Sequence, residues 1–397
     1  MVNLTPNPDF KARSACVLGA TGSVGTQTLD VLRELGIPAV MMTAGSNTEL
    51  FADIVREFRP RIAAVASEEA ARALTERLGS DSASEILWKR DEVLSAVRET
   101  EADVIFHSVA GLAGIPSALA AADSGKRVAM ANKEAVIACG DLLFEKLARS
   151  GGELIPVDSE HSALYRCLEG RSMDDVQSLL LTASGGPFHG RTAEELSRVT
   201  PEDALRHPTW KMGVKITVDS ATLMNKGFEI IEAVRLFGVP EDRVDVVVHR
   251  QSIVHSLVRF EDGVMLAALG NPDMRDCIRY AATAPHAART KEKPLDLTEI
   301  GSLTFEKPDL ESFPLLGAAR QAIRTGGTAP AGLIAADEEA VAAFLAGRAG
   351  FTELSSLVME TLSKITIYYD TSEESAAQTA REAALICRGL VERKQRV

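Results

Sequence analysis

A short apolar run that breaks into a glycine-rich turn constrains the fold of this chain more than any other feature. Residues 15–18 are apolar, glycines follow at positions 19, 22 and 25, and residues 26–35 have helical apolar spacing. In the order strand, turn and helix, backbone N–H groups at the helix start face an anion such as a phosphate. Because the spacing is G-x-x-G-x-x-G rather than G-x-G-x-x-G, the turn alone is also compatible with a structural role.

Alternating strand and helix patterns continue to about residue 157. We expect strands at residues 39–43, 62–65, 104–106 and 128–130, with helices between them. This alternation is typical of a parallel sheet with helices on both faces, which predicts an α/β fold with an N-terminal Rossmann-like domain. The second strand ends in small polar residues and lacks the acidic side chain that usually holds the NAD ribose, which favours NADP.

The polar cluster Asn132-Lys133-Glu134 follows the strand expected at residues 128–130. Ligands of open α/β sheets bind at the carboxyl ends of strands, so this cluster is placed to contact one. A solvated helix cap explains the same residues equally well.

An acidic pair, Asp158 and Glu160, comes directly after the apolar residues 154–157. If the segment remains an extended strand, both carboxylates point to the same face. Together with Glu229 they form an all-oxygen ligand set that suits Mg²⁺ or Mn²⁺ better than zinc. An isolated D-x-E pair is usually part of a solvated turn, but this one follows a dinucleotide-binding unit.

Anion-binding groups follow in the middle of the chain. The strand expected at residues 179–183 enters a Ser-Gly-Gly turn at 184–186, whose N–H groups are suited to an anion. If a helix begins near residue 225, then Asn225, Lys226 and Glu229 share one face. Phosphate-binding and metal-binding groups would then lie side by side.

The polar stretch from about residue 186 to 215 contains Trp210 and Met212 without a pattern of apolar partners. Large apolar groups on such a segment favour a lid that closes over a ligand and expels water. A tryptophan buried in a small separate core is the alternative.

These patterns divide the chain into four parts. We expect a Rossmann-like NADPH-binding domain at 1–157, a central α/β catalytic domain at 158–290, a linker at 291–314 and a C-terminal helical bundle at 315–397. An antiparallel pair at 256–260 and 264–268 belongs to the central domain, and His249 and His255 either line its site or fill its sheet.

Composition excludes several classes of protein. The formal net charge of -13 argues against nucleic-acid and anionic-membrane partners, which need a basic surface. Five scattered cysteines without C-x-x-C spacing favour neither a disulfide framework nor a zinc site, so a reducing cytoplasm is expected. Residues 1–13 have no apolar signal core, and the uncharged stretch 104–122 contains turn residues, so we expect no membrane span.

A series of short motifs stands in one order along almost the whole chain, at residues 19–25, 131–134, 156–161, 184–187, 206–208, 218–222, 225–227 and 272–275. In this order they resemble the 1-deoxy-D-xylulose 5-phosphate reductoisomerase family. The resemblance implies an oxidoreductase that converts 1-deoxy-D-xylulose 5-phosphate to 2-C-methyl-D-erythritol 4-phosphate in bacterial non-mevalonate isoprenoid synthesis. It also implies NADPH, a divalent metal (Mg²⁺, Mn²⁺ or Co²⁺), a sugar phosphate substrate and a cytoplasmic homodimer.

The resemblance also implies roles for individual residues. Metal ligands would be Asp158, Glu160 and Glu229, with Lys133 as a further catalytic residue between metal and cofactor. Cofactor-binding positions would be Thr21, Gly22, Ser23, Val24, Gly45, Asn47, Asn132 and Glu134. The substrate would be contacted at its phosphate by Ser184, Ser220, Asn225 and Lys226, and elsewhere by Ser159, His207, Trp210 and Met212.

Three residues depart from the commoner pattern of that family: Arg250, Asp276 and Ile334. They leave the proposed metal and phosphate ligands intact, but leave open the details of the loop at His249 and of the C-terminal packing.

Other classes of protein fit the sequence less well. An extended short-chain reductase needs a Y-x-x-x-K pair, and no tyrosine here has a lysine four residues on. A semialdehyde dehydrogenase needs an activated cysteine, and none has such surroundings. A catalytically inactive NADP-sensing protein would not need the three carboxylates and Lys226.

Overall fold

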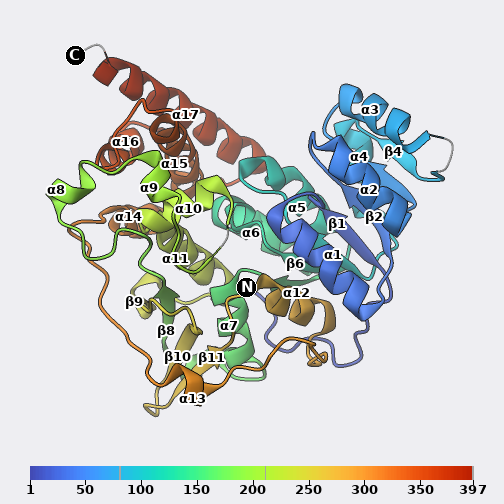
Figure 1. Cartoon of the computed structure of the whole chain (residues 1–397), viewed down its shortest axis with the longest axis horizontal. Helices are drawn as coiled ribbons and strands as arrows, with labels where there is room; N and C mark the ends of the chain where they lie inside the picture. The colour runs from blue at the N-terminus through green and yellow to red at the C-terminus, as the bar shows by residue number, and fades with distance from the viewer. Residues whose placement is uncertain (80–81, 211, 396–397) are drawn as a thin grey trace.

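The computed structural model describes residues 1–79, 82–210 and 212–395. Within them, a seven-stranded parallel sheet, a four-stranded mixed sheet and a helical C-terminal region confirm the expected α/β class. Figure 1 shows the first sheet and its helices on the right, the second sheet at lower left and the C-terminal helices at upper left. The domain boundaries that we expect at 157, 290 and 314 stay predictions.

The first sheet has the strand order β4-β3-β2-β1-β5-β6-β7. Its strands are almost wholly buried and apolar, as the strands of a sheet covered on both faces must be. They are β1 (Ala15–Leu18), β2 (Ala39–Thr43), β3 (Ile62–Ala64), β4 (Glu85–Leu87), β5 (Val104–His107), β6 (Arg127–Met130) and β7 (Glu153–Pro156). The order reverses between β1 and β5, so the usual ligand crevice of such sheets opens there.

Helices connect these strands, which confirms the expected alternation. They are α1 (Ser23–Leu35), α2 (Thr48–Phe58), α3 (Glu68–Leu78), α4 (Arg90–Arg98), α5 (Ile115–Asp123) and α6 (Lys133–Ser150). Of these elements, the sequence did not predict β4 and α4, because β4 is three residues long and partly exposed.

The acidic pair is not part of an extended strand, although the apolar run before it favours one. The strand ends at Pro156, and helix α7 (Ser159–Leu168) begins directly after Asp158, which occupies the N-cap position. A parallel strand of this kind is followed by a helix, and acidic residues at a helix start interact favourably with its dipole. Glu160 therefore lies in the first helical turn.

The second sheet has the order β11-β10-β8-β9. Its strands are β8 (Val176–Ala183), β9 (Val244–Val248), β10 (Val254–Phe260) and β11 (Met265–Leu269), and β10 runs antiparallel to β11 as expected. Helix α7 packs against β10, and the long helix α11 (Met224–Phe237) packs against β8 and β9. Helix α10 (Val214–Ala221) precedes α11, and α12 (Met274–Thr283) packs against α1 of the first domain.

Two short helices, α8 (Ala193–Leu196) and α9 (Pro201–Ala204), lie within the stretch at 186–215. Each begins with a capping box, in which a threonine side chain and an acidic side chain three residues later satisfy each other's backbone N–H groups. Residue 211 of the expected lid lies outside the described residues. The expected linker contains α13 (Leu297–Ile300), and Glu306 pairs with Val248 at the edge of the second sheet.

The C-terminal region is helical, as predicted. Its helices are α14 (Leu315–Thr325), α15 (Ala329–Leu345), α16 (Glu353–Leu362) and α17 (Glu373–Gln395), and residues 396–397 lie outside the described residues. Helix α15 is the buried centre of this bundle, since it packs against α16, α17 and also α6 of the first domain. Short 3-10 turns occur at Leu112–Gly114, Met173–Asp175 and Glu241–Arg243. Among the helices of the described ranges, we find none whose length and apolar character would let it cross a membrane.

Candidate active site

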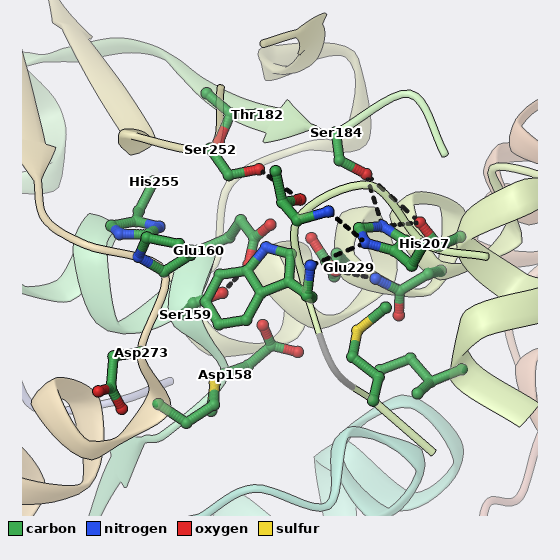
Figure 2. Close-up of a pocket in the computed structure, with 18 of the residues that line it drawn as sticks. Asp158, Ser159, Glu160, Thr182, Ser184, His207, Glu229, Ser252, His255 and Asp273 are labelled. Carbon is green, nitrogen blue, oxygen red and sulfur yellow. Dashed lines mark hydrogen bonds between the residues drawn. The ribbon is translucent and has the colours of Figure 1, made fainter. Parts of the chain in front are cut away.

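A cavity of about 710 Å³ lies where the first sheet, the second sheet and helices α10, α11 and α12 meet. It is at the carboxyl edge of the first sheet, as expected for an open α/β fold. The expected site residues that line it are Ser23, Val24, Lys133, Asp158, Ser159, Glu160, Ser184, His207, Trp210, Met212, Ser220, Asn225, Lys226 and Glu229. Figure 2 shows the labelled part of this wall.

The three carboxylates singled out in the sequence converge on this cavity. Asp158, Glu160 and Glu229 each offer an oxygen that lies within 4.8 Å of the others, although Glu229 comes from α11, far along the chain. Burial and the neighbouring Glu160 raise the pKa of Glu229 to about 7. Burial and the neighbouring carboxylate therefore oppose full ionisation of Glu229 at pH 7.

Two lysines place positive charge beside the three carboxylates. The Lys133 ammonium contacts Asp158, lies 3.4 Å from Oε1 of Glu229 and donates to the side-chain oxygen of Asn225 at 2.9 Å. Lys226 lies 2.8 Å from Oε1 of Glu160 and also contacts Glu229. Burial opposes the charged form of Lys133, but Asp158 and other carboxylates outweigh it and hold the pKa of Lys133 well above 10.5.

A buried pair behind this cluster was missed in the sequence. The His161 ring nitrogen Nδ1 lies 3.3 Å from Oε2 of Glu232 and 3.9 Å from Oδ1 of Asp158, and Nε2 donates to the carbonyl of Glu229 at 2.9 Å. Glu232 follows Glu229 by three residues on α11, so helical spacing could have indicated it. His161 therefore holds the backbone of Glu229 and lies beside the carboxylate of Asp158.

Three polar side chains from different elements form a second cluster in the cavity wall. The Nε2 atom of His207 lies 3.0 Å from Oγ of Ser184 and 3.1 Å from Oγ of Ser220 (Figure 2). The other nitrogen, Nδ1, accepts the backbone N–H of Trp210 at 2.9 Å, which assigns the ring proton to Nε2. Burial lowers the pKa of His207 to about 4, so the imidazole is neutral at pH 7.

A glycine lets the turn after β8, which carries Ser184, approach α10 closely. Gly186 has φ +65°, and a Cβ atom there would lie 2.7 Å from the carbonyl oxygen of Ser220. Only glycine fits such a backbone approach. The Gly186 N–H donates to Oγ of Ser184 at 3.2 Å, which orients that hydroxyl toward the cavity.

A left-handed residue separates α10 from α11. Leu223 has φ 60° and ψ 9°, a conformation that costs a non-glycine residue about 1 kcal/mol. The chain turns at this corner, so that Ser220 before it and Asn225 and Lys226 after it all face the same cavity.

Trp210 lies in the cavity wall and not in a separate core. Its ring is 6.1 Å from that of His255, at an interplanar angle of 56°, and Met212 lines the cavity beside it. Of the two roles open to His255, lining the site or filling the sheet, the structure supports the first, because His255 lines the cavity. His249 also reaches the cavity, but its ring stacks on Phe305 and Nδ1 donates to the carbonyl of Thr304.

The glycine-rich turn is fixed against the end of β2, because the N–H groups of Gly19 and Ala20 donate to the carbonyl of Thr43. Thr21 and Gly22 lie in this turn. Gly45 lies after β2, where a Cβ atom would have no neighbour within 4 Å among the described residues. The side chain of Asn47 caps α2.

The polar cluster after β6 has two kinds of members. Asn132 caps α6 and donates to the carbonyls of Val109 and Gly111, whereas Lys133 enters the cavity. Glu134 lies half-buried in the first turn of α6. Asn132 is therefore the helix cap, and Lys133 is the residue placed to contact a ligand.

Further polar residues line the cavity without a role predicted from the sequence, among them Thr26, Gln27, Asp30, Thr182, Ser252, Asp273 and Arg275. The motif at 272–275 could have indicated the last two. Of the departures from the family pattern, Arg250 is exposed, Asp276 accepts from Arg279 at 2.7 Å, and Ile334 is buried within α15.

Comparisons with known proteins agree along the chain. Family models described as 1-deoxy-D-xylulose 5-phosphate reductoisomerase match residues 15–140 and, for a C-terminal domain, 154–237, and a DXP reductoisomerase C-terminal domain matches 269–386. The reductoisomerase of Prosthecochloris aestuarii is 45% identical over 352 residues, covering 88% of this chain and 92% of that protein. That of Aromatoleum aromaticum is 46% identical over 367 residues, covering 90% and 91%.

Solved structures agree as well. The Zymomonas mobilis reductoisomerase in complex with NADPH has a TM-score of 0.90 and 38% identity, covering 96% of this chain and all 100% of that one. A DOX-P reductoisomerase in complex with NADPH, fosmidomycin and magnesium has a TM-score of 0.88 and 33% identity, covering 96% and 98%. From the fold, the converging carboxylates and these likenesses together, the chain belongs to the 1-deoxy-D-xylulose 5-phosphate reductoisomerase family.

Proposed function

We infer that this protein converts 1-deoxy-D-xylulose 5-phosphate to 2-C-methyl-D-erythritol 4-phosphate with NADPH and a divalent cation. The observation that carries this inference is the convergence of three carboxylates beside a nucleotide-binding fold, within one cavity that also holds neutral hydroxyl and imidazole groups. Relatives that span nearly the whole chain have this activity in their names.

The donor set fits a hard divalent cation. Asp158, Glu160 and Glu229 would hold it, because their oxygens already lie within 4.8 Å of one another and carboxylate oxygens are the ligands that Mg²⁺ and Mn²⁺ prefer. The turn at the start of α1 would hold the pyrophosphate of NADPH, with Thr21, Gly22, Ser23 and Val24 around it and Gly45, Asn47, Asn132 and Glu134 nearby. When bound, the cation supplies Lewis-acid polarisation of substrate oxygens and NADPH supplies the hydride.

The residues of the second cluster would orient the substrate. The hydroxyl groups of Ser184 and Ser220 would bind its phosphate, together with Asn225 and Lys226. Two of the three ammonium hydrogens of Lys226 are directed to Glu160 and Glu229, which leaves one for an anion. Holding the remote phosphate fixes the reacting carbons, so that binding energy contributes to the rate.

The neutral imidazole of His207 and the hydroxyl of Ser159 would contact the hydroxyl groups of the substrate. Lys133 would place positive charge beside the oxygens that gain negative charge as the carbon skeleton rearranges. Trp210 and Met212 would cover the substrate and exclude water while its carbon skeleton rearranges.

Turnover assays test this function directly. Purified protein should oxidise NADPH only with both 1-deoxy-D-xylulose 5-phosphate and Mg²⁺ or Mn²⁺ present, and mass spectrometry with NMR should identify a branched product. Simple reduction without rearrangement of the carbon skeleton would contradict the proposal.

We also propose that two copies associate through the second sheet. Strand β11 is at the edge of this sheet and exposes Met265 and Leu269, and Val264 beside them is 51% exposed. An unpaired apolar edge of this kind is suited to pairing with another chain. Light scattering should give a dimer, and Met265→Lys with Leu269→Lys should give a monomer.

The bacterial cytoplasm is the proposed location. All five cysteines are free, which is usual in a reducing compartment. The acidic net charge of -13 supports the proposal that neither nucleic acid nor an anionic membrane is a partner.

A further inference from the structure

An ionic cluster outside the cavity, with two buried carboxylates and a partly exposed lysine, joins the C-terminal bundle to helix α10. The Lys215 ammonium donates to Oδ2 of Asp219 at 2.7 Å and to Oδ2 of Asp337 at 2.6 Å. Asp219 is on α10 and Asp337 is on α15, and the two carboxylates are 3% and 1% exposed. The same ammonium lies 4.7 Å from the ring centre of Phe228 on α11, so one side chain contacts three helices.

The cluster and the cavity occupy neighbouring faces of α10. Ile216 and Ser220 line the cavity at the spacing i, i+4, which is one face of a helix. Lys215 and Asp219 each precede a member of that face by one residue, a rotation of about 100°. Whatever fixes the rotation of α10 at Lys215 and Asp219 therefore also fixes the position of Ser220.

The cluster also anchors the end of the segment that carries His207, Trp210 and Met212. Lys215 lies in the first turn of α10, two residues after Gly213, where that segment ends. The other end of the segment is tied to α10 through the contact of His207 with Ser220.

We propose that Asp337 is a positioning residue for the phosphate-binding side of the substrate site, acting through Lys215 and Asp219 to hold α10 and Ser220 in place. This inference rests on the proposed function, because it assigns the phosphate to Ser184 and Ser220. It gives the C-terminal bundle a part in substrate binding, although none of its side chains lines the cavity among the described residues.

The charges of the cluster favour a geometric role over one in stability alone. Two buried carboxylates face one ammonium, and Oδ1 of Asp219 has no hydrogen-bond partner within the described residues. Well-packed apolar side chains usually stabilise a fold as well as such an arrangement does. The ionic contacts instead fix a geometry, because both carboxylates must approach the same nitrogen atom of Lys215.

Kinetic measurements on the full chain with NADPH and Mg²⁺ test the proposal. Asp337→Ala should raise KM for the sugar phosphate about tenfold or more and leave the dissociation constant for NADPH within about twofold. Asp337→Asn, whose amide oxygen still accepts from Lys215, should restore KM to within about threefold of the original.

A matched control separates this effect from general loosening of the bundle. Arg320 on α14 contacts Glu241 and donates to the carbonyl of Val244 at 2.7 Å, and so also ties the bundle to the central domain, through residues that do not belong to α10. Arg320→Met should lower the melting temperature as Asp337→Ala does and leave KM unchanged. An equal rise of KM in both variants would overturn the proposal.

A second measurement does not depend on turnover. The chain has two tryptophans, so Trp88→Phe leaves Trp210 as the only one, next to the proposed phosphate site. Titration with inorganic phosphate should change the Trp210 emission, and Asp337→Ala should weaken this binding about tenfold. If the unaltered protein bound phosphate in this way but did not convert the sugar phosphate, the proposed function would fail and the positioning role would stand.

The proposal fails if Asp337→Ala folds and leaves both KM and phosphate binding within about twofold of the original. If Asp337→Ala does not fold, Asp337→Leu takes the same tests by the same criteria, because leucine fills the buried space of the aspartate but cannot accept a hydrogen bond from Lys215.

Discussion

The ammonium nitrogen of Lys226 lies 2.8 Å from Oε1 of Glu160. A residue proposed to bind the substrate phosphate thus also contacts a proposed metal ligand, and it contacts Glu229 as well. The two parts of the site are therefore coupled through one side chain. A change at Lys226 should be measurable in the dependence of the rate on both ligands.

Lys226→Met should raise KM for the sugar phosphate about tenfold or more, since one charged donor to the phosphate is lost. The same variant should need less divalent metal for half-maximal rate, because a positive charge beside the carboxylates is gone. Initial rates over a grid of substrate and metal concentrations measure both constants. An unchanged KM would remove Lys226 from the phosphate site.

Glu229→Gln should abolish turnover and leave the affinity for NADPH nearly unchanged. The amide has the size of the carboxylate but lacks the charge that a hard cation requires. Binding of Mn²⁺, followed by electron paramagnetic resonance, should weaken in parallel. Loss of NADPH binding together with turnover would indicate misfolding instead, which circular dichroism would detect.

Two glycines of the first turn should respond differently to a methyl group. At Gly25 a Cβ would lie 2.1 Å from the carbonyl oxygen of Gly19, a backbone atom that cannot move aside, whereas at Gly22 the nearest atom is 3.4 Å away. Gly25→Ala should lower the free energy of unfolding by about 3 kcal/mol and prevent NADPH binding, and Gly22→Ala should change that free energy by about 0.5 kcal/mol or less. Urea unfolding and NADPH fluorescence titration check the pair, and equal destabilisation would contradict it.

His107 should make the protein less stable in acid. The ring is fully buried, its Nε2 lies 2.8 Å from Oγ of Ser117, and burial lowers its pKa from 6.5 to about 4. Because the unfolded chain binds this proton more readily, the stabilisation is complete above pH 6.5 and is lost as the pH falls toward 4. The expected loss is about 3 kcal/mol.

A variant that cannot titrate isolates this contribution. His107→Gln keeps a polar partner for Ser117, so the difference in unfolding free energy between it and the original protein should shrink between pH 7 and pH 4. A difference that is constant with pH would show that His107 is not the titrating group. The carboxylates contribute equally to both proteins and cancel in the comparison.

Local patterns in the sequence were sufficient for much of the fold. The strand and turn at 15–25, the helix that places Lys226 and Glu229 on one face, and the antiparallel pair β10–β11 follow from periodicity and turn residues over short ranges. The end of β7 was misjudged, since an apolar run does not indicate where a strand gives way to a helix. Asp158 occupies the N-cap position of that helix without a capping hydrogen bond from its side chain, and its carboxylate reaches the cavity.

The parts of the site that escaped prediction depend on tertiary contacts. The carboxylate of Asp337 meets Lys215 across 122 residues, and His161 meets Glu232 from another helix. The two members of each pair are far apart in the sequence, so nothing along the chain indicates that they meet. The motifs that resemble a known family supplied candidate ligands, but the contacts of Lys226 with both Glu160 and Glu229 required coordinates.

The left-handed corner at Leu223 has a consequence for inhibitor design. Because a single residue sets the angle between α10 and α11, it also sets the span from the Ser220 hydroxyl to the carboxylate of Glu229. A bifunctional compound, with an anionic end and a chelating end, would be selected by the length of its spacer. Replacing Leu223 with glycine would let the angle between the two helices vary, and the preference for one spacer length would decrease.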